Sequence, residues 1–144
     1  MADRHSCTVA GTPDEVFAYL TDQSRVGEWN REIVSSRVVD PPLREGATLE
    51  QVRRRGSKEA TDHLEIVEHD PPHRHRVRGE VSGINVMIGF QLEPAAGGTK
   101  VSMGHKSRVT GFKRLFGGGI DKALDETTAQ AMQALPGAFA KRNG

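Results

Sequence analysis

Residues 47–68, ATLEQVRRRGSKEATDHLEIVE, decide the fold, because two strand-like runs meet there at the Gly56-Ser57 dipeptide. A two-residue turn that contains glycine is typical of a β-hairpin, whose two strands run antiparallel. This turn predicts that Leu49 lies opposite Leu64, and residues that lie directly opposite share one face of a sheet. The stretch therefore predicts an antiparallel sheet with one apolar face.

Strand-like segments recur on both sides of this hairpin. Turn-forming residues separate them, such as Asp40-Pro41-Pro42, Ser82-Gly83 and the stretch from Pro94 to Gly98. Segments joined by such short links are expected to pair as antiparallel neighbours. The predicted strands are Ser6–Ala10, Ile33–Val39, Ala47–Arg55, Ser57–Glu68, Arg74–Val81, Ile84–Glu93 and Thr99–Arg108.

Three segments predict helices. Thr12-Pro13-Asp14-Glu15 combines an N-cap threonine, a proline suited to the first helical position and a glutamate that completes a capping box. Gln23–Trp29 predicts a second, short helical segment. Apolar residues recur at helical spacing from Gly119 to about Lys141, and a helix of that length can cross a whole sheet. Pro136 is expected to kink or end this last helix.

The His69–Pro72 loop predicts the next register. If it joins two strands directly, Glu68 pairs with His73, and Leu64 then lies opposite Val77. Both residues are apolar, which agrees with a shared inward face. The only large element left to cover this face is the C-terminal helix.

Five polar side chains interrupt the inward face, namely Gln51, Arg53, Asp62, His75 and His105. Polar groups on a buried face either pair with one another or line a cavity. Arg53 and Asp62 are diagonal neighbours on adjacent strands, so an ion pair between them is expected. His75 and His105 are predicted to lie two strands apart, with roughly 12 Å between their backbones. We therefore expect neither a shared metal nor a tight catalytic dyad.

Composition excludes several classes of protein. The 144 residues are expected to form a single domain, 1–144, and 20 basic against 19 acidic residues leave a net charge of +1. Such a balance gives no general attraction to nucleic acid or to an anionic membrane. The single cysteine, Cys7, allows no internal disulfide and suits a reducing compartment. We expect no signal peptide, no membrane-spanning segment and a cytoplasmic location.

The order of one strand, two short helices, six strands and a long helix resembles the START-like helix-grip superfamily, and most closely its polyketide cyclase/dehydrase and lipid-transport branch. The matching stretches are Thr12–Leu20, Trp29, Ile66–Pro72, Leu92–Val101 and the C-terminal helix. The resemblance implies an α+β fold in which a seven-stranded antiparallel sheet wraps around the last helix and leaves a cavity. It also implies an apolar or amphipathic ligand, such as a lipid, a polyketide or a quinone.

Three functions follow as alternatives. The chain binds or carries such a ligand, or it is a cyclase or dehydratase, or it is a protein-interaction module without a small ligand. In the enzyme, Asp62 or His105 would remove a proton next to a carbonyl and Arg53 would stabilise the oxyanion. No cofactor, metal or nucleic acid is expected, and a homodimer stays open. The candidate ligand-binding residues are Trp29, Gln51, Arg53, Asp62, Leu64, His75, Val77, Val86, Ile88, Phe90, Met103, His105 and Leu124.

Overall fold

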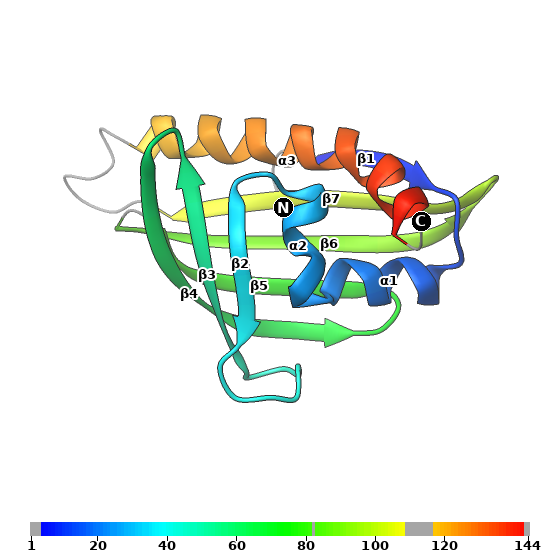
Figure 1. The fold of residues 1–144 in the computed structure, drawn as a ribbon, viewed down its shortest axis with the longest axis horizontal. Helices are drawn as coiled ribbons and strands as arrows, with labels where there is room; N and C mark the ends of the chain where they lie inside the picture. The colour runs from blue at the N-terminus through cyan, green and yellow to red at the C-terminus, as the bar shows by residue number, and fades with distance from the viewer. Residues whose placement is uncertain (1–3, 82, 109–116, 143–144) are drawn as a thin grey trace.

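A curved sheet and one long helix dominate the computed structural model, which describes residues 4–81, 83–108 and 117–142. The long helix lies along the sheet, and the short helices lie near the C-terminal half of the long helix (Figure 1). In chain order the elements are β1 (Arg4–Val9), α1 (Pro13–Thr21), the 3₁₀ helix η1 (Gln23–Arg25), α2 (Val26–Trp29), β2 (Ile33–Val38), β3 (Thr48–Arg55), β4 (Lys58–Asp70), β5 (Arg74–Val81), β6 (Ile84–Ala95), β7 (Gly98–Arg108) and α3 (Gly117–Lys141).

The sheet has seven strands in the order β1-β7-β6-β5-β4-β3-β2, and every neighbouring pair is antiparallel. The predicted fold class is thereby confirmed. At one end, β3 and β4 curl up toward the start of α3 (Figure 1). An ion pair of 3.8 Å between Arg55 at the β3–β4 turn and Glu126 of α3 closes this end.

The predicted capping box is present at the start of α1. The Thr12 hydroxyl accepts a hydrogen bond from the Glu15 backbone N–H at 3.2 Å, and the Glu15 carboxylate accepts one from the Thr12 backbone N–H at 3.2 Å. Pro13 occupies the first turn, where its missing N–H costs nothing. Pro136 does not end α3, because the helix continues to Lys141.

The register of β3 with β4 follows the prediction, with Arg55 opposite Lys58 and Leu49 opposite Leu64. The predicted register of β4 with β5 is wrong, because Leu64 pairs with Gly79 and not with Val77. An irregularity between Ile66 and Glu68 shifts the register of the pair, and the ladder extends to the end of β4 at Asp70. Over the first part of β4 the error amounts to two residues, so the inward face is unchanged.

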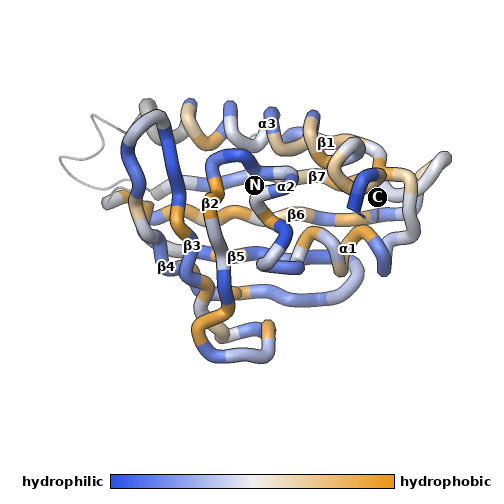
Figure 2. Tube along the Cα trace, viewed as in Figure 1, coloured by the Kyte–Doolittle hydropathy of each residue, from blue (hydrophilic) through white to orange (hydrophobic). Residues whose placement is uncertain are grey.

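The core divides into three hydrophobic clusters. The largest joins α1, α2 and the C-terminal half of α3 to β6 and β7, while the other two lie under the curled part of the sheet and near the β5–β6 turn. Ile88 of β6 packs against all three. Figure 2 shows hydrophobic residues along α1 and β6, the elements that meet the largest cluster.

Candidate functional site

A cavity of about 90 Å³ lies between the inward face of the sheet and α3. Sites for drug-sized ligands usually measure roughly 300–1,000 Å³, so this space is small for a ligand. Apolar side chains from the sheet, α1, α2 and α3 form most of its wall. The lining residues are Leu20, Gln23, Val26, Trp29, Asn30, Leu49, Gln51, Leu64, His75, Val77, Ile88, Gly89, Phe90, Met103, Leu124, Thr127 and Thr128.

Most of the ligand-binding residues proposed from the sequence meet at this cavity. Those that line it are Trp29, Gln51, Leu64, His75, Val77, Ile88, Phe90, Met103 and Leu124. Arg53, Asp62, Val86 and His105 are buried or half-buried, but they do not line the cavity. The three residues suggested for acid–base chemistry, Asp62, His105 and Arg53, all belong to this second group.

Arg53 and Asp62 form the ion pair that their diagonal positions predicted. Nε of Arg53 donates to Oδ2 of Asp62 at 2.9 Å, and Nη2 donates to Oδ1 at 3.5 Å. The Asp62 side chain is 9% exposed and that of Arg53 is 22% exposed. Both carboxylate oxygens are thus held by the guanidinium, away from the cavity wall. The ion pair therefore links β3 to β4.

His105 is 1% exposed, on β7 opposite Ile88. His75 lies opposite Phe90 on the other side of β6. The two histidines are therefore two strands apart and displaced by two residues, as the sequence predicted. An acid–base role for His105 stays a prediction.

His75 belongs to a cluster of aromatic rings that the sequence did not reveal. Its Nδ1 lies 3.1 Å from Nδ1 of His69, and its ring stacks on Phe90 with 5.3 Å between centroids. The ring of Phe17 meets both histidines. Two neutral imidazoles joined through Nδ1 require one donor and one acceptor, so the pair fixes opposite tautomers. Burial, with a smaller effect of His69, lowers the pKa of His75 to about 4.

Polar contacts hold Gln51 at the edge of the cavity. Gln51 Nε2 donates to the Ser36 hydroxyl at 3.2 Å, and this hydroxyl donates to Gln23 Oε1 at 2.6 Å. Gln23 Nε2 in turn donates to the Thr21 carbonyl at 2.8 Å. Gln23 is a lining residue that sequence reasoning missed, since a polar residue in a 3₁₀ helix of three residues carries no burial signal.

Trp29 supplies a polar group without a partner. The residue is 3% exposed, and among the described residues its indole Nε1–H meets no hydrogen-bond acceptor. A buried donor left in this state costs roughly 1–3 kcal/mol. An acceptor that reached this nitrogen would recover that free energy.

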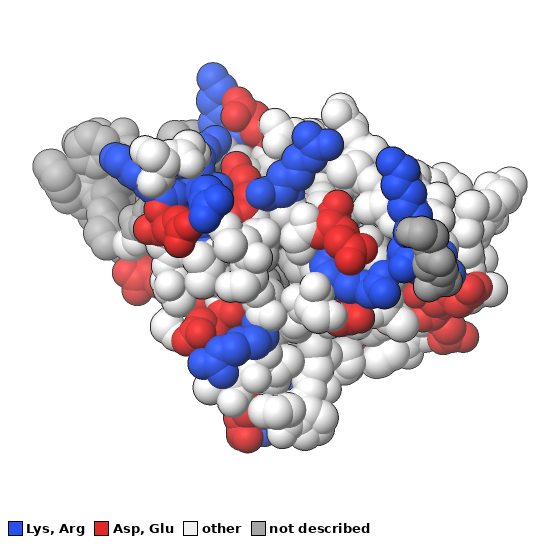
Figure 3. Space-filling model, in the orientation of Figure 1, with Lys and Arg blue, Asp and Glu red and all other residues white. Residues whose placement is uncertain are grey.

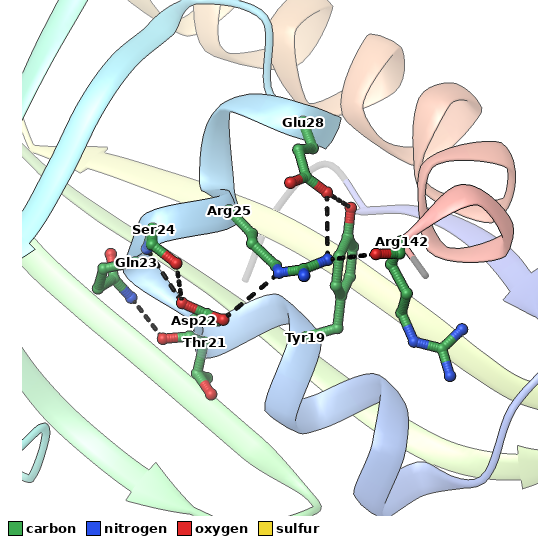
Figure 4. A network of polar contacts seen from close by, with 8 residues as sticks. All are labelled: Tyr19, Thr21, Asp22, Gln23, Ser24, Arg25, Glu28 and Arg142. Atoms are coloured by element: carbon green, nitrogen blue, oxygen red, sulfur yellow. Dashed lines mark hydrogen bonds and ion pairs between the residues drawn. The ribbon is translucent and has the colours of Figure 1, made fainter. Parts of the chain in front are cut away.

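A polar network holds the short helices against the end of α3 (Figure 4). The Tyr19 hydroxyl donates to Glu28 at 2.8 Å, and Arg25 donates to the Arg142 carbonyl at 3.0 Å. Arg25 also approaches the carboxylates of Asp22 and Glu28 at 3.7 and 3.8 Å. Because Glu28 directly precedes Trp29 in α2, this network holds the backbone segment that carries the indole.

Three observations concern metal ligands, membrane-spanning helices and surface charge in the described ranges. No three His, Cys, Asp or Glu side chains there come together as metal ligands. No helix of the described chain is both long and apolar enough to cross a membrane. On the face shown in Figure 3, basic and acidic side chains lie next to one another and do not segregate by sign.

A seven-stranded antiparallel sheet that curls around a C-terminal helix, with short helices after the first strand, defines a START-like helix-grip protein. Residues 4–142 match the family model described as polyketide cyclase / dehydrase and lipid transport, and the chain belongs to this family. No curated protein matches the sequence.

Solved structures show the same fold at low sequence identity. The chain is similar to the protein TTHA0849 from Thermus thermophilus, with 16% identity, a TM-score of 0.75 and 98% of each chain covered. It is also similar to Ara h 8.0201, with 15% identity, a TM-score of 0.69 and 95% of each chain covered. The di-domain ARO/CYC BexL, from the BE-7585A biosynthetic pathway, gives 20% identity and a TM-score of 0.81. That match covers 98% of this chain and 47% of BexL, so the chain spans about half of the di-domain protein.

Proposed function

We propose that this protein binds a small apolar or amphipathic molecule between the sheet and α3, as a binding or carrier protein. The observation that carries the proposal is the buried indole of Trp29, which lines a mostly apolar cavity and whose Nε1–H meets no acceptor among the described residues. Apolar burial contributes about 25 cal/mol per Å² of ligand surface, and one hydrogen bond to the indole orients the ligand.

The polar lining groups define what else the ligand carries. Gln51 and Gln23 line the cavity with amide groups that also bond Ser36. On α3, Thr127 lines it with a hydroxyl that donates to the Ala123 carbonyl at 2.9 Å and keeps its oxygen as an acceptor. None of them is a charged side chain. A molecule with an apolar body and a few hydrogen-bonding oxygens matches this wall better than a strongly charged one.

A ligand of ordinary size requires the wall to move, because the cavity holds only about 90 Å³. Leu124 lies in the first half of α3 and is half-buried, as are its neighbours Ala123 and Asp125. Ile88 is half-buried although it sits at the centre of the sheet and contacts three clusters. Displacement of these two side chains enlarges the space without breaking a hydrogen bond.

A cyclase or dehydratase is the alternative that the family description includes. It would need an acid or base facing the ligand. Asp62 is engaged by Arg53, and His105 lies outside the cavity wall. The arrangement therefore favours binding over acid–base chemistry by these residues. The third alternative, a protein-interaction module, does not account for an internal cavity with a few polar groups in its mostly apolar wall.

Filling the cavity is expected to weaken binding strongly. With dodecanoic acid as the probe and isothermal titration calorimetry as the measurement, Leu124→Phe should weaken binding by at least about tenfold, because the larger ring occupies the ligand's space. Leu43→Phe is the matched control, since Leu43 packs on a core cluster but does not line the cavity.

Asp62→Ala separates binding from catalysis. The binding account expects little change in affinity, because Asp62 lies off the cavity wall.

Equal affinity of the wild type and Leu124→Phe, with both proteins folded by circular dichroism, would contradict a ligand site between the sheet and α3.

A further inference from the structure

A second hollow lies on the outer side of Trp29. It measures about 240 Å³ and runs between the α2–β2 connection and the middle of α3. We call it the outer groove, and its lining residues are Trp29, Asn30, Arg31, Glu32, Thr127, Gln130, Ala131, Gln133 and Ala134. Its wall is more polar than that of the inner cavity.

Three residues line both spaces, namely Trp29, Asn30 and Thr127. We call the wall that these residues form between the two spaces the partition, and the indole of Trp29 is the largest side chain in it. Neither space alone reaches the roughly 300 Å³ at which drug-sized ligand sites begin, whereas the two joined exceed it. A ligand of that size fits only if the partition opens.

Opening the partition requires little loss of polar interactions. Its Nε1–H has no hydrogen bond to break among the described residues. On α3, Thr127, Ala131 and Ala134 share one helix face, and the two alanines leave room beside the indole. Turning the indole therefore sacrifices apolar contact but no hydrogen bond.

We propose that Trp29 is a gate between the outer groove and the inner cavity, and that one elongated amphipathic ligand occupies both spaces. This inference rests on the proposed function. The apolar part of the ligand lies in the inner cavity and its polar end lies in the outer groove. The Nε1–H of the turned indole donates to a ligand oxygen near the junction of the two spaces.

The groove residues indicate the chemistry of the polar end. Arg31 contributes a guanidinium, and Asn30, Gln130 and Gln133 contribute amides. The carboxylate of Glu32 lies 3.8 Å from Arg55, so its charge is partly balanced. Donors thus outnumber uncompensated acceptors, and the polar end is one that accepts hydrogen bonds, such as a carboxylate, a carbonyl or a hydroxyl.

The test fills the outer groove and leaves the inner cavity intact. Ala134→Leu places a larger side chain in the groove, and Ala140→Leu makes the same change at an exposed position of α3 outside both spaces. Dodecanoic acid is titrated into each folded variant by calorimetry. Ala134→Leu is expected to weaken binding by at least about tenfold, and Ala140→Leu by less than about twofold.

Comparison with the inner variant separates the two claims. Loss of affinity in both Ala134→Leu and Leu124→Phe supports a ligand that spans the gate. Loss in Leu124→Phe alone overturns the gate and keeps the proposed function. Loss in Ala134→Leu alone, or no saturable binding of dodecanoic acid by the wild type, overturns both.

A second readout reports the gate itself, because Trp29 is the only tryptophan in the chain. Binding of dodecanoic acid should shift the fluorescence emission of Trp29 to longer wavelength, because its Nε1–H gains an acceptor. Dodecylammonium has the same chain but only donors at its end, and it should bind at least about tenfold more weakly. Unchanged emission at saturation with dodecanoic acid, or equal affinity for the two probes, contradicts the proposal.

Discussion

Phe139→Ala is expected to lower the free energy of unfolding by about 3–5 kcal/mol, the usual cost of truncating a fully buried phenylalanine. The ring is 2% exposed and meets Tyr19 edge-on with 5.6 Å between centroids. On another side, a Cβ added to Gly11 would lie 2.6 Å from the ring, so the backbone there closes directly over it. The Arg142 guanidinium lies 3.7 Å from the ring centroid. The surroundings cannot collapse easily into the space that alanine would leave.

Urea unfolding at neutral pH measures this loss. Val34→Ala is the control, because Val34 is 48% exposed and its truncation should change stability by less than about 0.5 kcal/mol. A loss below about 1 kcal/mol in Phe139→Ala would show that the C-terminal end of α3 is not anchored as the structure has it.

Acid is expected to destabilise the protein through His75. In the unfolded chain this histidine binds a proton near its ordinary pKa of 6.5, whereas burial lowers its pKa in the folded protein to about 4. Between these values the unfolded chain binds more protons, so the free energy of unfolding falls as pH decreases from about 6.5 to about 4. The contribution of this one group is roughly 3 kcal/mol at the lower end.

His75→Gln isolates this contribution, because glutamine stays neutral across the whole range. Urea unfolding of the variant should show a clearly weaker loss of stability between neutral pH and about pH 4. His63→Gln is the matched control, since it makes the same change at a histidine whose side chain is 60% exposed. Identical pH slopes in the wild type and His75→Gln would rule out a neutral, buried His75.

The fold was predictable where turn chemistry and alternation agree. The Gly56-Ser57 turn fixes its hairpin within two residues, so the register of Leu49 with Leu64 follows directly. The β4–β5 hairpin offered no such constraint. The irregularity between Ile66 and Glu68 carries no glycine signal, and it moves His69 from the predicted loop into a strand beside His75. Alternation alone cannot reveal a slip of two residues, because both registers bury the same face.

The site was predictable from the strands and less so from the connections. Residues such as Val77, Ile88 and Phe90 reach the cavity because their parity fixes their direction. Gln23 and Asn30 line it from short segments that have no periodicity. The engagement of Asp62 by Arg53 was predictable from the hairpin, whereas its distance from the cavity depends on how strongly β3 and β4 curl. Because that curvature depends on all seven strands of the sheet, the sequence of one hairpin does not reveal it.

Native mass spectrometry of the purified protein tests the occupancy of the sheet–helix space most directly. We predict a second species heavier than the bare chain by the mass of one apolar or amphipathic molecule, absent from Leu124→Phe prepared in the same way. A wild-type spectrum with only the bare chain, or an adduct equally abundant in Leu124→Phe, would contradict the account.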